Sequence, residues 1–229
     1  MKKATANFLS SMTIFGTIGL FVDAIPLNSG AIALFRGAMG LAFLLLMMAF
    51  TKQKLRFDEI KKELLLLCIS GGAMGLNWVL LFEAYNYVPV SIATLTYYCA
   101  PAFVIIASAF VLKEKLTSAK IIGVVTAMIG MAMVNLQSFE VGSAKGVIFG
   151  LMSAVLYASV TITNKKVKGF SGLEVTLIQL ACASLVLIPY TMMTSSVGEI
   201  FKIDLKGMIF LAILCLFHTG VCYWLYFIS

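Results

Sequence analysis

Ionisable side chains inside the apolar runs of this 229-residue chain are the groups best suited to bind a solute or a proton. Arg36 lies about eight residues into one run, where a charge costs about 2.5–3.5 kcal/mol in a bilayer and should face protein and a partner. It would contact a bound solute, or act as a structural clamp that pairs with helix-end carbonyls, Asp23 or Glu83. His218, the only histidine, could carry a coupling proton, because an unperturbed imidazole titrates at about pH 6.5, or it could hydrogen-bond between helices.

Pro101 lies in the middle of another apolar run. Its ring removes a backbone donor and clashes with the carbonyl of Tyr97, so a kink is predicted here. A carbonyl freed at membrane depth must be satisfied by protein or by a water-filled cavity. Tyr97 and Tyr98 would then form one wall of a substrate cavity, or they would pack around a kink.

The remaining candidates are weaker. Glu83, at the end of a run, could bind a proton or a cationic substrate at the outer mouth, or could be a wetted helix-end carboxylate. Glu114 follows a run between two lysines, where the simplest interpretation is an electrostatic anchor. Amide and aromatic groups within the runs could bind substrate, although such groups also pack helices; they are Asn77, Trp78, Tyr157, Gln179 and Trp224.

Residues for metal binding or catalysis are not evident. The five cysteines form no CxxC pair, so neither a zinc site nor a disulfide framework is indicated. The chain has no GxSxG or HExxH motif and no P-loop. We therefore expect no metal, no cofactor and no catalytic residue, and the chain is not expected to be an enzyme.

The elements that position these residues must be membrane-spanning helices. The chain is 61% hydrophobic and only 12% charged, with a mean hydropathy of +1.02, whereas soluble domains contain about 25% charged residues. A helix crosses a bilayer with about 20 mostly apolar residues. Eight stretches qualify, roughly 6–25, 29–50, 63–84, 89–112, 118–136, 144–164, 172–195 and 207–229.

Positive charge alternates along this pattern. Thirteen of the 17 Lys and Arg residues lie before the first run or in the second, fourth and sixth gaps between runs. Short loops rich in Lys and Arg stay in the cytoplasm, so the alternation predicts a cytoplasmic N-terminus in the cytoplasmic membrane. The net charge of +7 is then the sum of these loops and needs no nucleic acid.

An internal repeat organises the helices. Residues 75–82 resemble residues 220–227, and Arg36 corresponds to Gln179, at offsets of 145 and 143. The repeating unit is therefore five helices long, and an odd number places the second copy upside down relative to the first. We expect a first repeat at 1–136 and an incomplete second repeat at 137–229, with about 52 residues and two helices absent. Glycines spaced by four, such as Gly71 and Gly75, predict close helix packing.

One segment resembles a known family. Residues 97–103 contain Pro101, residues 112–116 contain Glu114, and a Gly-containing run follows at 129–134. This order, with Arg36 upstream, resembles the EamA-like half-repeat of the drug/metabolite transporter superfamily over residues 6–136, and more loosely over 144–229. The resemblance implies an all-α polytopic membrane protein with eight of ten transmembrane helices, two inverted five-helix repeats and a central substrate pathway.

We therefore expect a secondary transporter that moves a small metabolite or drug-like solute by alternating access. Its expected partners are a small-molecule substrate, membrane lipid and a coupling proton, and a homodimer is left open. A channel would need a charged or carbonyl-lined filter, and an intramembrane enzyme would need a nucleophile and a base. Both remain as alternatives.

Overall fold

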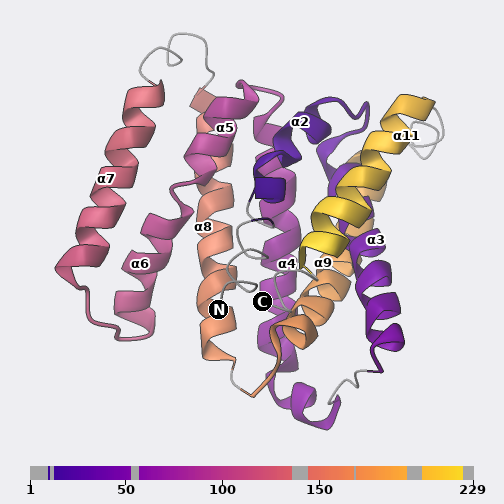
Figure 1. The fold of residues 1–229 in the computed structure, drawn as a ribbon, viewed down its shortest axis with the longest axis horizontal. Coiled ribbons are helices and arrows are strands. Elements are labelled where there is room, and N and C mark those ends of the chain that lie inside the picture. The colour runs from indigo at the N-terminus through magenta and orange to yellow at the C-terminus, as the bar shows by residue number, and fades with distance from the viewer. Residues whose placement is uncertain are drawn as a thin grey trace. The chain divides into compact units, whose positions relative to one another are not determined.

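The computed structural model describes residues 10, 13–52, 57–135, 144–167, 169–194 and 203–223, and within these ranges it contains helices and no strands (Figure 1). The elements are α2 (Ile18–Asp23), α3 (Ser29–Phe50), α4 (Phe57–Ala84), α5 (Val90–Tyr97), α6 (Ala100–Val111), α7 (Ser118–Asn135), α8 (Ala144–Lys166), α9 (Gly172–Thr194), α11 (Leu205–Ala212) and the π-helix η1 (Ile213–Val221).

Five helical segments are long and apolar enough to cross a membrane, namely Ser29–Phe50, Lys61–Ala84, Val90–Val111, Ala144–Lys166 and Gly172–Thr194. They coincide with five of the eight predicted stretches. The other three contain the shorter apolar helices Thr13–Asp23, Ser118–Gly130 and Leu205–Val221, counted over the described ranges only. The prediction of an all-α membrane protein is confirmed.

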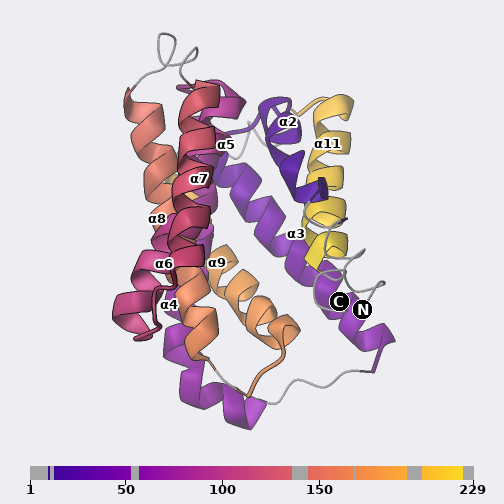
Figure 2. The same ribbon diagram turned by 60° about the vertical axis from the view of Figure 1, so that its left-hand side comes forward.

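Contacts divide the chain into two compact units, with the boundary inside α4. Unit 1 comprises Met1–Gly75 and Gly169–Ser229, and unit 2 comprises Leu76–Lys168. In unit 1, α3 packs along α9 and η1, while α11 contacts η1, α2 and α3; the two ribbon views agree on this grouping (Figures 1 and 2). In unit 2, α8 packs against α5 and α6, and α7 contacts α6.

Local capping groups fix where several helices begin. Asn28 accepts a hydrogen bond from the Ala31 amide at 2.8 Å before α3, and Asp204 accepts one from the Gly207 amide at 2.9 Å before α11. At α9, the Ser171 amide donates to the Glu174 carboxylate at 2.8 Å, and the Glu174 amide donates back to the Ser171 hydroxyl at 3.2 Å. This reciprocal pair is a capping box, and it explains why a carboxylate is tolerated in a buried position.

The predicted break at Pro101 is confirmed. α5 ends at Tyr97 and α6 begins at Ala100, so Pro101 stands in the first turn of a new helix. In that turn the missing proline N–H would have no intrahelical partner in any case. The Phe103 amide donates to the Cys99 carbonyl at 3.2 Å, which starts the hydrogen-bond pattern of α6.

Glu114 ties the connection after α6 to the end of α8. Its amide donates to the Ser108 carbonyl at 3.2 Å. Its carboxylate lies 3.4 Å from the Lys120 ammonium of α7 and 3.2 Å from the Lys165 ammonium of α8. The hydrogen bond from Lys165, followed by that from Lys120, lowers the pKa of Glu114. The predicted anchor is therefore a three-residue ion-pair network.

Predicted close packing at Gly71 is also confirmed. A Cβ atom on Gly71 would lie 2.6 Å from the Gln179 carbonyl oxygen and 2.9 Å from its Cα, both of which belong to the backbone of α9. The neighbouring Gly72 is roomier, because its nearest contact would be a side-chain methyl of Val186 at 3.6 Å. The α4–α9 crossing therefore requires glycine at one of these two adjacent positions.

This pair provides a matched test of packing. Gly71→Ala and Gly72→Ala both gain about 1 kcal/mol of helix propensity, but only Gly71→Ala must push two helices apart. We expect Gly71→Ala to lower the melting temperature in detergent by several degrees, and Gly72→Ala to keep or raise it. Equal melting temperatures for the two variants would contradict the close approach.

The Glu114 network predicts a pH-dependent contribution to stability. A carboxyl whose pKa is lowered on folding stabilises the folded state above its unfolded pKa, and this effect is lost as the pH falls through the folded pKa. Glu114→Gln should therefore lower the melting temperature slightly at pH 7, and this difference should shrink as the pH falls below the ordinary glutamate pKa of about 4.3 and through the lowered pKa of Glu114. Because the pair is partly exposed, 1 M salt should remove the difference at pH 7. A difference that is unchanged by pH and by salt would contradict the assignment.

Candidate functional site

The π-helix η1 carries two buried polar side chains of unit 1, His218 and Thr219. Its backbone hydrogen bonds span five residues, whereas those of an α-helix span four. Single turns of π-helix occur frequently at functional sites. Two consecutive side chains contact carbonyls five residues earlier. His218 Nδ1 lies 3.3 Å from the Ile213 carbonyl, and the Thr219 hydroxyl donates to the Leu214 carbonyl at 3.3 Å. Both side chains are buried, at 2% and 0% exposed.

Arg36 joins this region from α3. Its side chain is 4% exposed, and its Nε donates a hydrogen bond to Thr219 Oγ1 at 2.9 Å. A continuous chain of hydrogen bonds therefore runs from the guanidinium through Thr219 to the Leu214 carbonyl. The sequence suggests Asp23 or Glu83 as a clamp partner of Arg36; one hydrogen bond of its guanidinium goes to a threonine hydroxyl.

Small residues allow α3 and η1 to approach closely around this contact. A Cβ atom on Gly40, four residues after Arg36, would lie 2.6 Å from the Thr219 methyl group. A Cβ atom on Gly220 would lie 2.5 Å from the ring of Phe43. Larger residues at either glycine would separate the two helices and lengthen the hydrogen bond from Arg36.

His218 also contacts the N-terminal part of unit 1. Its Nε2 lies 2.8 Å from the Thr17 hydroxyl, and the Thr17 hydroxyl donates to the Ile14 carbonyl, also at 2.8 Å. The ring of Phe21 lies 4.8 Å from the imidazole, centroid to centroid. We call Thr17, Phe21, Arg36, His218 and Thr219 the π-helix cluster.

The remaining amide candidates bind other helices through short hydrogen bonds. Gln179 on α9, 1% exposed, donates to the Ser70 hydroxyl of α4 at 2.6 Å. Asn77, also 1% exposed, donates to the Ser153 carbonyl at 2.6 Å and to its hydroxyl at 2.8 Å. The Ser153 hydroxyl donates back to the Asn77 carbonyl at 3.0 Å. Asn77 and Ser153 thus form a clamp between α4 and α8 in unit 2.

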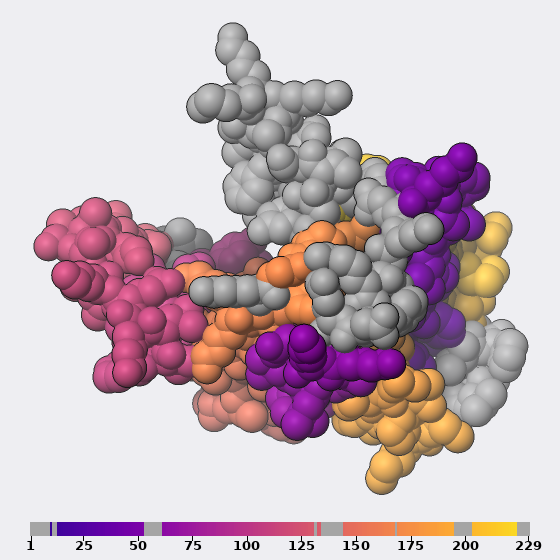
Figure 3. Space-filling view, turned by 90° about the horizontal axis from the view of Figure 1, so that it is seen from below, coloured from indigo at the N-terminus to yellow at the C-terminus, as the bar shows by residue number. Residues whose placement is uncertain are grey.

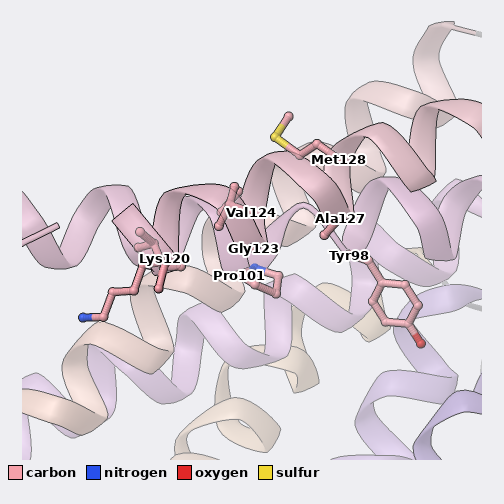
Figure 4. A pocket seen from close by; sticks show the side chains of 10 residues that line it. Tyr98, Pro101, Lys120, Gly123, Val124, Ala127 and Met128 are labelled. Atoms are coloured by element: carbon pink, nitrogen blue, oxygen red, sulfur yellow. The ribbon is translucent and has the colours of Figure 1, made fainter. Parts of the chain in front are cut away.

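The tyrosines near the Pro101 break separate into two environments. Tyr97 packs edge-on against Tyr157 of α8, with ring centroids 5.5 Å apart. Tyr98 is 51% exposed, and with Pro101 it lines a groove of about 320 Å³ between α6 and α7 (Figure 4). Of the two tyrosines predicted to form one wall of a cavity, Tyr98 lines this groove and Tyr97 packs against α8 instead.

Three candidates remain. Trp78 is buried in unit 2, at 5% exposed. Glu83, near the end of α4, accepts a hydrogen bond from the Asn86 side chain at 3.3 Å. Trp224 lies outside the described residues. Over the described ranges, no group of three or more His, Cys, Asp or Glu residues could hold a metal ion.

Sequence reasoning missed Thr17, Phe21 and Thr219. Thr219 directly follows the only histidine, so the pair His218–Thr219 within an apolar run was an available signal. Thr17 and Phe21 carried no comparable signal, because their contacts with His218 come from a segment about 200 residues away in the chain.

Comparisons with known proteins agree with the membrane fold. The chain is 26% identical over 234 residues to a Bacillus subtilis (strain 168) protein named "Uncharacterized transporter YxxF", covering 100% of this chain and 74% of that protein. It is 26% identical over 147 residues to "Uncharacterized transporter in sor 3'region" of Acidianus ambivalens, covering 63% and 56%.

A solved structure described as "Crystal structure of protein" superposes with a TM-score of 0.73 over 98% of this chain and 78% of the other, at 15% identity, and so supports the fold. The profile of the EamA-like transporter family matches residues 3–136 and 144–229, which is nearly the whole sequence. The chain therefore belongs to the EamA-like transporter family.

Proposed function

We propose that this transporter is a secondary carrier for a small solute in the cell membrane, and that the π-helix cluster contacts the solute or a coupled proton. The observation that carries the proposal is the burial of two groups at the π-helix: Arg36, which donates to Thr219 of η1, and His218 of η1, which contacts Thr17. Charged and titratable groups at membrane depth are expensive and generally belong to substrate or proton pathways. Two carbonyls of the π-helix, those of Ile213 and Leu214, lie within hydrogen-bond distance of the buried side chains of His218 and Thr219.

The two sequence repeats supply a means of alternating access. Inverted repeats at 1–136 and 137–229 would provide two similar halves that rock about a site near the bilayer midplane. The distribution of Lys and Arg favours an N-terminus in the cytoplasm. In this arrangement Arg36 and its repeat counterpart Gln179 would lie at related depths, one as a cation and the other as a neutral amide.

The hydrogen bonds of His218 support proton coupling. Its Nδ1 faces the Ile213 carbonyl, which can only accept. Its Nε2 faces the Thr17 hydroxyl, whose single proton is directed to the Ile14 carbonyl. A doubly protonated imidazole satisfies all of these acceptors, whereas a neutral imidazole requires Thr17 to redirect its proton. Loss of a proton from His218 would thus rearrange the contact between η1 and the N-terminal segment.

The direct test is transport by the purified protein in proteoliposomes. A panel of radiolabelled amino acids, carboxylic acids, sugars and nucleosides would be screened for counterflow, in which internal unlabelled solute drives uptake of the same labelled solute. A carrier gives stoichiometric, saturable counterflow. Ion conductance far above carrier turnover, without counterflow, would favour a channel and contradict the proposal.

Arg36 should affect transport more than stability. We expect Arg36→Gln to reduce counterflow at least tenfold, because hydrogen bonds to a charged group contribute about 1.5–3 kcal/mol. Thr219 keeps its own bond to the Leu214 carbonyl, so the melting temperature should change little. Asn77→Ala, which breaks the α4–α8 clamp, is the contrasting variant and should mainly lower the melting temperature. If Arg36→Gln abolishes folding while Arg36→Lys restores both folding and full transport, Arg36 is only a structural clamp.

His218 should affect the response to pH. We expect His218→Gln to abolish the stimulation of uptake by a pH gradient while preserving solute counterflow at a fixed pH. Phe217→Leu, at the adjacent position, which is 46% exposed, is the matched control and should retain the pH response. An unchanged pH response in His218→Gln would show that His218 does not carry a coupled proton. The assignment of Arg36 would be unaffected by that result.

A further inference from the structure

An apolar groove with one basic end runs between α6 and α7 in unit 2. Pro101 and Ile105 line one side, Val124 and Met128 line the other, and its volume is about 320 Å³. Lys120 lies at one end and Tyr98 at the other, and the sticks in Figure 4 show this order along the groove. The groove therefore has a charged end followed by a long apolar wall.

Two local features border the groove. The break at Pro101 separates α6 from α5, and Gly123 on α7 presents no side chain, so that a Cβ atom there would have no neighbour within 4 Å. α7 is widely exposed, with Ile122 at 63% and Ile129 at 55%. Figure 3 shows the surface of this part of the chain in pink. In a membrane protein such an apolar surface faces acyl chains.

The basic end carries an excess of positive charge. Around the exit of α6 and the end of α8 lie five described lysines and one glutamate: Lys113, Lys115, Lys120, Lys165, Lys166 and Glu114. Glu114 is shared by two of the lysines, Lys120 and Lys165. Each ammonium has three donors, so Lys120 can bind Glu114 at 3.4 Å and still donate to a phosphate oxygen at the mouth of the groove.

We propose that this groove binds an anionic phospholipid, with one acyl chain along Ile105, Val124 and Met128 and the phosphate headgroup at Lys120 and Lys115. Basic pockets between membrane helices bind anionic headgroups, and each Lys near the surface contributes noticeably to that attraction. The acyl chain fills an apolar wall that would otherwise lack partner atoms. A lipid held in this way links α7 to α6, which otherwise contact each other sparingly. The proposal is independent of the solute that is transported.

Native mass spectrometry of the full chain tests the proposal directly. The protein would be released from mixed micelles that contain equal amounts of dioleoyl phosphatidylglycerol and dioleoyl phosphatidylcholine. We expect about tenfold preferential retention of phosphatidylglycerol, and we expect 0.5 M ammonium acetate to reduce it. Equal retention of the two lipids by the wild-type protein would overturn the proposal. Displacement of the retained lipid by inorganic phosphate would show a soluble-anion site and would also overturn it.

Variants that remove single charges distinguish lipid binding at this groove from nonspecific attraction to the net positive charge of the protein. Lys115→Gln, which leaves the Glu114 network intact, should reduce the preference severalfold, and Lys115→Gln with Lys120→Gln should abolish it. Lys206→Gln, on α11 of unit 1, removes the same charge and should leave the preference unchanged. If Lys206→Gln has the same effect as Lys115→Gln, net charge alone is responsible and the site does not exist.

Filling the groove tests the position of the acyl chain. Val124→Trp should reduce retention of both lipids, while Val125→Trp, at the adjacent position, which is 49% exposed, should retain the preference. Melting temperatures of both variants establish that they are folded. Unchanged retention in a folded Val124→Trp protein would place the lipid elsewhere. A dimer mass that replaces the lipid adducts would assign this face to a second copy of the chain instead.

Discussion

A cation within an apolar helix is the constraint around which the polar contacts of unit 1 are arranged, and the Arg36 guanidinium meets it by donating a hydrogen bond to Thr219. A bilayer provides no water to solvate a guanidinium, so the charge must be met by protein groups at its own depth. Thr219 meets it from η1, and the glycines Gly40 and Gly220 bring the two helices close enough for the contact. The same crossing buries His218 against the N-terminal segment. The position of one cation therefore constrains α3, η1 and the segment around Thr17.

Helices were predictable because their signals are local and strong. Three kinds of signal specify structure within a few residues: long apolar stretches, the capping box at Ser171 and the proline at position 101. Pro189 shows the limit of such rules, because α9 continues through it from Gly172 to Thr194. A proline in an apolar helix breaks it only where its neighbours do not compensate for the lost hydrogen bond. The π-helix could not be anticipated either, since its apolar sequence also suits an α-helix.

Partners of the polar residues were less predictable than their burial. Arg36, Asn77, Gln179 and His218 were all expected within the membrane, and all four are buried. Their partners Thr219, Ser153, Ser70 and Thr17 lie 76 to 201 residues away in sequence. All four partners contribute a Ser or Thr hydroxyl, and the composition of the surrounding sequence gives no further signal. The tertiary arrangement thus decides that Asn77 clamps two helices, while Arg36 and His218 gather at one site.

The spacing of the hydrogen bonds in η1 fixes the direction of its side chains. Its hydrogen bonds span five residues, and a return to the four-residue spacing of an α-helix would turn one end of the segment relative to the other by about 100°. His218 and Thr219 would then swing away from the acceptors that they contact at Ile213 and Leu214. The π-helical spacing of the nine residues of η1 therefore determines that His218 and Thr219 face Thr17 and Arg36.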